Sequence, residues 1–152
     1  MTYLLSCGPR PAFLALFLVL AACDTPPPYS EAAVQAATEL KADSIALLQQ
    51  ANEPFPSHAD EAARISTEAS AEALAASRIP GNGAVEEQWR LITDPDGNLL
   101  GGTLARWETQ GTLSRGFRDE VVGEVAQAFD TLICTEQAKQ AARSCAAPAG
   151  GN

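Results

Sequence analysis

Paired carboxylates beside an aromatic ring are the one arrangement in this sequence that suggests catalysis. Glu86 and Glu87 come just before Trp89, and Asp94 and Asp96 follow it. Two carboxyl groups that flank a glycosidic bond, one acting as acid and the other as base or nucleophile, hydrolyse glycans. An enzyme that uses acidic residues is therefore one alternative for this chain.

Each of these acids also has an ordinary structural explanation. Glu86 and Arg90 stand four residues apart, so on a helix they would pair at the surface. Asp94 fits the N-cap of a helix that begins at Pro95, and Asp96 fits its first turn, where the helix dipole favours negative charge. These explanations favour a non-catalytic protein.

Other groups that serve chemistry are scarce. His58 is the only histidine, so a serine triad lacks its usual base and a histidine-based zinc site lacks partners. The sequence has no Cys-x-x-Cys-His motif for covalent haem, and its paired glycines open no phosphate-binding loop. We expect no metal and no cofactor, and we expect His58 at the surface near a helix cap.

Near the N-terminus, Leu20-Ala21-Ala22-Cys23 resembles the lipobox of bacterial lipoproteins. In that family the cysteine is diacylated on sulfur and becomes the first residue after cleavage. Residues 12–22 contain no polar side chain and follow Arg10. As a helix they would span about 16 Å, roughly half of a bilayer core, which is typical of a signal-peptide core. The alternative is an ordinary secretory signal, with Cys23 a plain thiol.

The resemblance implies a protein that is anchored to a lipid bilayer. Residues 1–22 would be the cleaved lipoprotein signal peptide, and the acyl chains on Cys23 would hold the protein stably, since two or more chains suffice. Residues 23–29 would be the lipidated cysteine and a proline-rich tether, about 15 Å long as polyproline II. Asp24 resembles the inner-membrane retention signal of enteric lipoproteins. We therefore expect a cell-envelope protein on the inner membrane, facing the periplasm.

The charge of the chain narrows the range of partners. Cleavage after Ala22 removes Arg10 and no acidic residue, so the net charge changes from −9 to −10. An acidic surface argues against nucleic acid, whose phosphates require Lys and Arg. It also argues against adhesion to anionic headgroups, which attract basic segments. The lipid on Cys23 would then be the whole attachment.

Two cysteines, Cys134 and Cys145, remain after Cys7 leaves with the signal and Cys23 takes lipid. In an exported protein such a pair favours a disulfide over a redox or metal site. On an unbroken helix their Cα atoms would lie about 16 Å apart, whereas a disulfide requires less than about 7 Å. We expect the last helix to end shortly after Cys134, or to fold back near 139–144, with the bond inside one chain. The rival outcome is a straight helix with free thiols or a bond between two molecules.

Apolar residues spaced three and four apart predict the helices that must position these groups. The first begins at Ser30, which reads as its N-cap, and runs to about Asn52. The second covers about 58–78, with Ser57 and Asp60 spaced as a capping box. Proline and glycine residues break the chain after each of them.

The segment 89–104 has two possible structures. In one, its centre at 94–97 is the turn of a β-hairpin. In the other, Asp94 is the N-cap of a helix that begins at Pro95. We choose the helix because a strand would bury Gly101 and Gly102 in its middle, where glycine packs nothing. The helix would bury Leu100, Leu104 and Trp107, and a shorter one before it would bury Val85, Trp89 and Ile92. Gly111 should end the helix and Ser114 should cap the last one, whose apolar stripe is Phe117, Val121, Val125, Ala128 and Leu132.

These elements predict an all-α fold, a small bundle of four to five helices over residues 30–145, with a disordered tail at 146–152. The expected function is a non-catalytic accessory or protein-interaction role with an unknown envelope partner. The alternative is a bundle that binds a small apolar ligand between helices, with Trp89 and Trp107 as its platform. In the simpler structural explanation both tryptophans are core residues. An exposed apolar patch would favour the protein-interaction role. An enclosed pocket lined by both tryptophans would favour the ligand-binding bundle.

Overall fold

The computed structural model describes residues 27–140 and Cys145. In this part of the chain there is no strand, and the elements are α1 (Glu31–Leu48), a short 3-10 helix η1 (Phe55–Ser57), α2 (Ala59–Ser77), α3 (Gly83–Thr93), α4 (Leu100–Gln110) and α5 (Arg115–Ala138). The predicted all-α bundle is confirmed, and the strands of the hairpin alternative do not form. None of these helices combines the length and the apolar character that crossing a bilayer requires.

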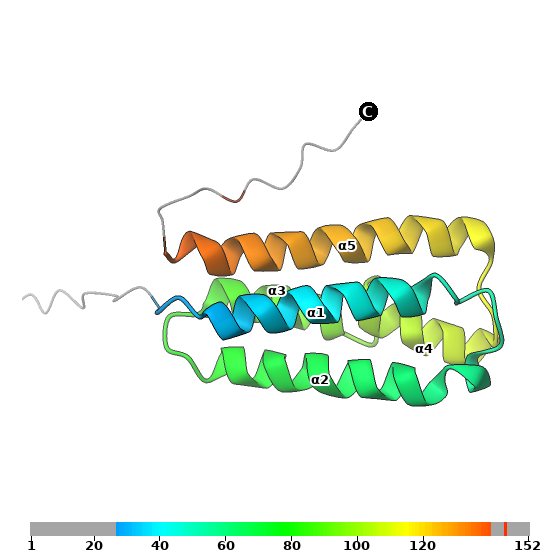
Figure 1. Cartoon of the computed structure of the whole chain (residues 1–152). Coiled ribbons are helices and arrows are strands. Elements are labelled where there is room, and N and C mark those ends of the chain that lie inside the picture. The colour runs from blue at the N-terminus through cyan, green and yellow to red at the C-terminus, as the bar shows by residue number, and fades with distance from the viewer. Residues whose placement is uncertain (1–26, 141–144, 146–152) are drawn as a thin grey trace, which may run out of the picture.

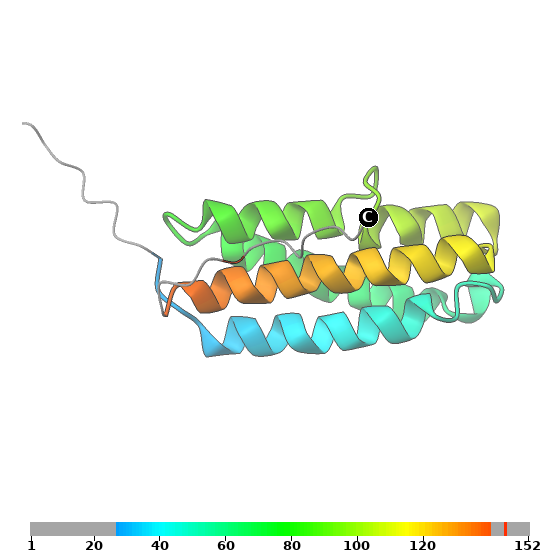
Figure 2. The ribbon, with the colours of Figure 1, turned by 90° about the horizontal axis from the view of Figure 1, so that it is seen from above.

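The helices form an antiparallel four-sided bundle (Figure 1). α1 and α3 each pack against both α2 and α5, while α4 continues the line of α3 and shares the fourth side with it (Figure 2). Because the chain reverses between successive sides, the start of α1, the α2–α3 loop and the end of α5 lie together. We call this end the tether end, because residues 27–30 enter the bundle there, and the opposite end the distal end.

One hydrophobic core runs through the bundle. Its largest fully buried side chains include Trp107, Phe129 and Ile65. Burying such a side chain stabilises the fold by about 2 kcal/mol. The predicted faces of α3 and α4 are buried completely, whereas Phe117 and Ala128 on the predicted stripe of α5 are only half-buried. The spacing of apolar residues therefore identified the core correctly in most places.

The connection between α3 and α4 differs from its prediction. Gly97 N donates to Asp94 O at 3.1 Å, and Asp96 N donates to Asp94 Oδ1 at 3.0 Å, so this segment is a β-turn. It joins two helices rather than two strands. Asp94 ends α3, and α4 begins only at Leu100. The prediction of Asp94 as N-cap and Pro95 as the first helical residue is wrong, because the Asp94 side chain bonds inside the turn.

Two glycines allow α4 to follow this turn so closely. A Cβ atom at Gly101 would overlap Thr93 O, and one at Gly102 would overlap Gly97 O. Only a residue without a side chain lets these backbones approach so closely. The glycine pair that argued against a strand is therefore needed for helix packing.

The caps of the helices were partly predicted. Ser30 and Ser114 cap α1 and α5, and their Oγ atoms accept from the backbone N–H three residues on, at 3.2 and 3.3 Å. The capping box of Ser57 and Asp60 does not form. His58 occupies the N-cap position of α2, without a side-chain cap bond, because η1 takes up Ser57.

Two loops are tied together at the distal end. Leu113 N donates to Ala51 O at 2.7 Å, and Phe55 N donates to Gly111 O at 2.8 Å. α1 accordingly ends at Leu48 rather than near Asn52, since the chain turns to make these bonds. Gly111 ends α4 with φ +79°, the left-handed conformation expected of it.

Candidate functional site

The predicted anchor lies outside the described residues. Cys23, the predicted signal peptide at 1–22, the first part of the tether and the tail at 146–152 all belong to the undescribed part of the chain. The last residues of the predicted tether, 27–29, are described, and they lead through Ser30 directly into α1 at the tether end.

Two of the four acids around Trp89, Glu87 and Asp94, make structural contacts. Trp89 is 3% exposed, whereas Glu86 and Glu87 lie at the surface. Arg90 binds Glu87 through two nitrogen–oxygen contacts of 2.6 and 2.7 Å, and these bonds hold the pKa of Glu87 below its ordinary value. The predicted Glu86–Arg90 pair is wrong, because the guanidinium is occupied by the acid three residues before it.

The two aspartates complete this picture. Asp94 Oδ2 lies 3.9 Å from the Arg90 guanidinium, and its Oδ1 accepts the bond inside the turn. Asp96 is exposed on the same turn. Glu87 and Asp94 thus make structural contacts, whereas the side chains of Glu86 and Asp96 are exposed. Across residues 27–140 and Cys145, no group of three His, Cys, Asp or Glu residues is placed to hold a metal ion.

His58 is less exposed than predicted. It stands at the cap of α2, as expected, but only 13% of its side chain is exposed. Its Nε2 atom lies 3.0 Å from Glu53 Oε2, and its ring centroid lies 5.3 Å from that of Trp107. The ring is therefore part of the packing of the distal end.

The two tryptophans occupy separate parts of the core. The Trp107 indole donates to Glu53 O at 2.9 Å and meets the Phe55 ring edge-on, with centroids 5.4 Å apart. Trp89 packs edge-on against Phe129, at 5.9 Å between centroids. A common platform of Trp89 and Trp107 is therefore not formed.

Of the two tryptophans, only Trp89 lines a hollow of about 200 Å³ at the tether end. The start of α1, the end of α2, the α2–α3 loop, α3 and the end of α5 form its wall, and Trp107 is not part of it. Most of the lining is apolar, from small alanines together with Ile79, Val85 and Trp89. A concave apolar site with a few polar groups is the usual form of a small-molecule site.

One polar group of this wall lacks a partner. Asn82 is 3% exposed, and its Nδ2 donates to Ala76 O at 3.1 Å. Because a carbonyl oxygen can only accept, this bond fixes the orientation of the amide and leaves Oδ1 without a donor. A buried polar atom without a partner costs about 1–3 kcal/mol. The atom has almost no accessible surface, so a molecule in the hollow does not reach it.

A second polar group of the wall is a buried glutamate. Glu136 Oε1 accepts from Ser30 N at 3.0 Å, and Oε2 pairs with Lys139 Nζ at 2.5 Å. The Glu136 and Lys139 side chains are only 5% and 8% exposed. Glu136 was not predicted as a site residue, although it follows Leu132 by four residues and so continues the apolar stripe of α5. A charged residue on an apolar stripe is the signal that could have identified it.

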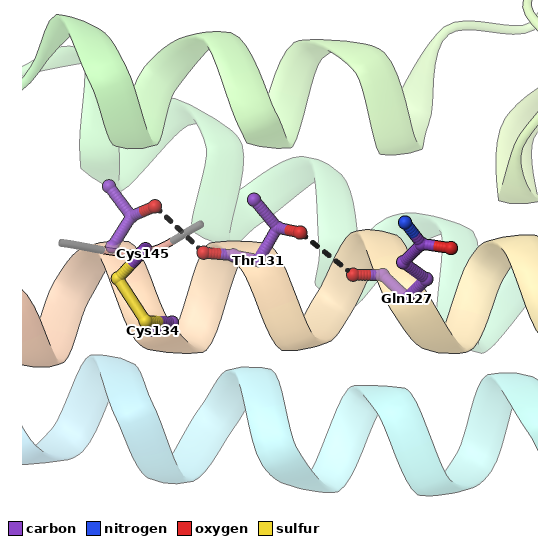
Figure 3. Close-up of a disulfide and its surroundings, with 5 residues drawn as sticks. Gln127, Thr131, Cys134 and Cys145 are labelled. Carbon is purple, nitrogen blue, oxygen red and sulfur yellow. Dashed lines mark hydrogen bonds between the residues drawn. A yellow bond between two sulfur atoms is a disulfide. The ribbon is translucent and has the colours of Figure 1, made fainter. Parts of the chain in front are cut away.

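The disulfide lies on the same stretch of α5 (Figure 3). Cys134 and Cys145 are bonded, with Cα atoms 5.7 Å apart. α5 ends at Ala138, shortly after Cys134, as the distance argument required. Around Cys134 the helix is regular. The Thr131 hydroxyl donates to Gln127 O at 3.0 Å, and the Thr135 hydroxyl donates to Thr131 O at 2.7 Å. The bond holds Cys145 against α5 at Cys134.

The chain matches no protein-family model, no curated protein and no solved structure. Its candidate functional features are therefore those of its own residues. They are Cys23, which ends the predicted lipobox, and three features of the tether end: the hollow beside Trp89, the Glu136–Lys139 pair and the Cys134–Cys145 bond.

Proposed function

We propose that this protein is a lipid-anchored, non-catalytic protein of the bacterial cell envelope. Its helical domain faces the periplasm, on the inner membrane if Asp24 acts as a retention signal. There it serves as an accessory or interaction partner of another envelope protein. The observation that carries the proposal is the sequence Leu20-Ala21-Ala22-Cys23, placed at the end of an apolar run.

Two features of the domain support this proposal. The Cys134–Cys145 bond suits an oxidising compartment such as the periplasm. Of the acids that suggested catalysis, Glu87 is paired with Arg90 and Asp94 accepts a bond inside the turn at 94–97, so neither is a free carboxylate beside Trp89. For contact with a partner, Leu74 on α2 and Leu91 on α3 expose 53% and 40% of their surface.

The anchor is tested by changing Cys23→Ala in cells that export the protein. The altered protein should lose incorporation of labelled fatty acid and move from the membrane fraction to the soluble fraction, because its acidic surface has no affinity for anionic headgroups. Cys7→Ala is the matched control, since Cys7 would leave with the signal peptide. Cys23→Ala protein that is cleaved normally and still resists carbonate extraction would contradict the anchor.

The accessory role requires a partner that contacts the domain. Cross-linking in intact envelopes, followed by mass spectrometry, should give one major adduct that disappears when a photo-reactive residue is moved from Leu74 or Leu91 to a position elsewhere on the surface. Adducts of equal yield from all positions would indicate chance encounters and would contradict the role.

A further inference from the structure

We propose that a second copy of this chain docks on a groove between α2 and α4, and that the two copies pair with their α2 helices antiparallel. The proposal goes beyond the accessory role, because it assigns one surface to one partner, and it does not depend on the anchor at Cys23. Leu91 stands two residues before Thr93, which lines the groove, so it lies on the far side of α3. It is left for the envelope partner of the accessory role.

The groove follows the side of α2 where α4 lies beside it (Figure 1). Its volume is about 490 Å³, and no lysine or arginine is among its lining residues. On α2 the wall consists of alanines and serines between Ala59 and Ser70, and across from them stand Gly101, Leu104 and Ala105. Because most of these side chains are short, a helix of another molecule can lie close to them.

The side chain that fits this groove stands on the same helix. Leu74 is 53% exposed, and it follows Ser70 by four residues, so it continues the face of the groove by one turn of α2. It is not among the lining residues and lies beyond the end of the groove in its own chain. Only a second copy can therefore place this leucine inside the groove and remove its apolar surface from water.

One two-fold axis satisfies both copies at once. Leu74 and Ser66 each stand four residues from Ser70, and Ser66 lines the groove. An axis perpendicular to α2 at Ser70 therefore brings Leu74 of each copy opposite Ser66 of the other. The contact is self-complementary, as a closed two-fold dimer requires.

The charges along α2 agree with this register. The same axis brings Arg78 of one copy opposite Ala62 of the other, near Asp60 and near Glu108, which lines the groove. All three charged side chains are exposed, and within residues 27–140 and Cys145 none of them makes an ion pair. Opposite charges that face each other across an interface fix its register.

The face is large enough for a weak, specific dimer. The 19 residues of α2 span about 28 Å, and α2 together with the line of α3 and α4 is about 20 Å wide, which gives about 560 Å² on each copy. The pair would bury about 1,100 Å² in total, near the lower end of the range for specific interfaces. We therefore expect a dissociation constant in the micromolar range.

Two anchored copies can form this pair on one bilayer. Antiparallel helices place the two tether ends at opposite ends of the dimer. Both tethers reach the same surface when the helix axes lie along it, with α1 and α2 nearest the lipid, because residues 27–30 enter the bundle at the start of α1. Without the anchor, the same pair forms in solution.

Cysteine cross-linking in intact envelopes tests the register, with two differently tagged copies expressed together. Ser70→Cys lies at the axis and should give a disulfide-linked dimer that contains both tags. Ala63→Cys, exposed on the same face, is the matched control, because its two copies would lie about 20 Å apart along the helices. Equal dimer from both positions would mean a parallel or chance contact. An adduct with another protein would mean a different occupant, and either result would overturn the proposal.

Sedimentation of the exported, processed Cys23→Ala chain measures the affinity without detergent. We expect a monomer–dimer equilibrium at micromolar concentration. Leu74→Gln should weaken it at least about ten-fold, whereas Leu91→Gln, an exposed leucine outside the groove, should not. A chain that stays a monomer at hundreds of micromolar would overturn the proposal. Failure of the anchor would leave this measurement unchanged, so the two failures are distinguishable.

A charge exchange tests the predicted contact of Arg78. Arg78→Glu should weaken the dimer about five-fold, because the new carboxylate would face Asp60 and Glu108. Adding Glu108→Arg should restore the affinity to within about two-fold of the wild type. Arg115→Glu, at an exposed position of α5, changes the net charge equally and should have little effect. A double variant that pairs no better than Arg78→Glu alone would refute the antiparallel register.

Discussion

Glu136 joins the start of α1 to the end of α5. Its carboxylate accepts from Ser30 N, 106 residues earlier in the sequence, and pairs with Lys139. Both side chains of the pair are nearly buried, so neither charge is solvated by water. A buried pair of this kind stabilises little by itself, but removal of one partner leaves an uncompensated charge.

We therefore expect Glu136→Gln to lower the free energy of unfolding by about 3 kcal/mol, because Lys139 keeps its buried charge. The double change Glu136→Gln with Lys139→Met should recover most of this loss, since it removes the stranded charge. Urea unfolding followed by circular dichroism gives both values.

Glu87→Gln is the control for this prediction. Like Glu136, Glu87 forms an ion pair, in its case with Arg90. This pair lies at the surface, where water screens the charges. Its substitution should leave the unfolding midpoint unchanged. A Glu136→Gln protein with wild-type stability would show that Lys139 simply turns out to solvent.

At the scale of elements, α4 depends on a close approach between backbones. Its first turn packs onto the turn at 94–97. At Gly101 and Gly102 the two backbones lie too close together to leave room for a methyl group. Gly123, on α5, stands in contrast, because a side chain there would meet open space. The two kinds of glycine make opposite predictions for the same substitution.

Gly102→Ala should destabilise the protein by about 3 kcal/mol, since the added methyl group displaces either α4 or the turn. Gly123→Ala should stabilise it by about 1 kcal/mol, because alanine is the better helix former and nothing blocks it. Thermal unfolding of both variants beside the wild type measures the difference. If both substitutions raise the midpoint, the turn is free to move and the packing argument fails.

At the scale of the whole molecule, the bundle is closed at both ends by contacts between distant segments. Hydrogen bonds join the loops at Ala51 and Leu113 at the distal end. The disulfide and the Glu136 contacts hold the tether end. Closure at the tether end keeps the last turn of α5 against the start of α1, and so maintains the hollow.

We expect the Cys134–Cys145 bond to form within one chain in the exported protein. Non-reducing electrophoresis should show a monomer, and alkylation should find no free thiol at either position. Reduction should lower the free energy of unfolding by about 3 kcal/mol, from the loop of chain that the bond closes in the unfolded state. A disulfide-linked dimer, or two reactive thiols, would contradict the arrangement in Figure 3.

The sequence by itself determined the helices and most of the buried face of each. Val85, Trp89 and Ile92 were placed in the core from their spacing alone, and Ser30 and Ser114 were recognised as caps. These features follow from neighbours within one or two turns of helix, so a local pattern contains the information needed to predict them. The end of α5 near Cys134 was also predictable, because a disulfide limits the distance between its Cα atoms.

Only the tertiary structure decided which groups meet. Asp94 was expected to begin a helix and instead closes a turn, because α4 must lie against that turn to continue the line of α3. Trp89 and Trp107 are both core residues, as their simpler explanation predicted, and they do not form the alternative common platform because α3 and α4 are placed end to end. The hollow and its polar atoms on Asn82 and Glu136 arise where four helices and a loop converge. No single stretch of sequence contains that convergence, because it depends on contacts between residues as distant as 30 and 136.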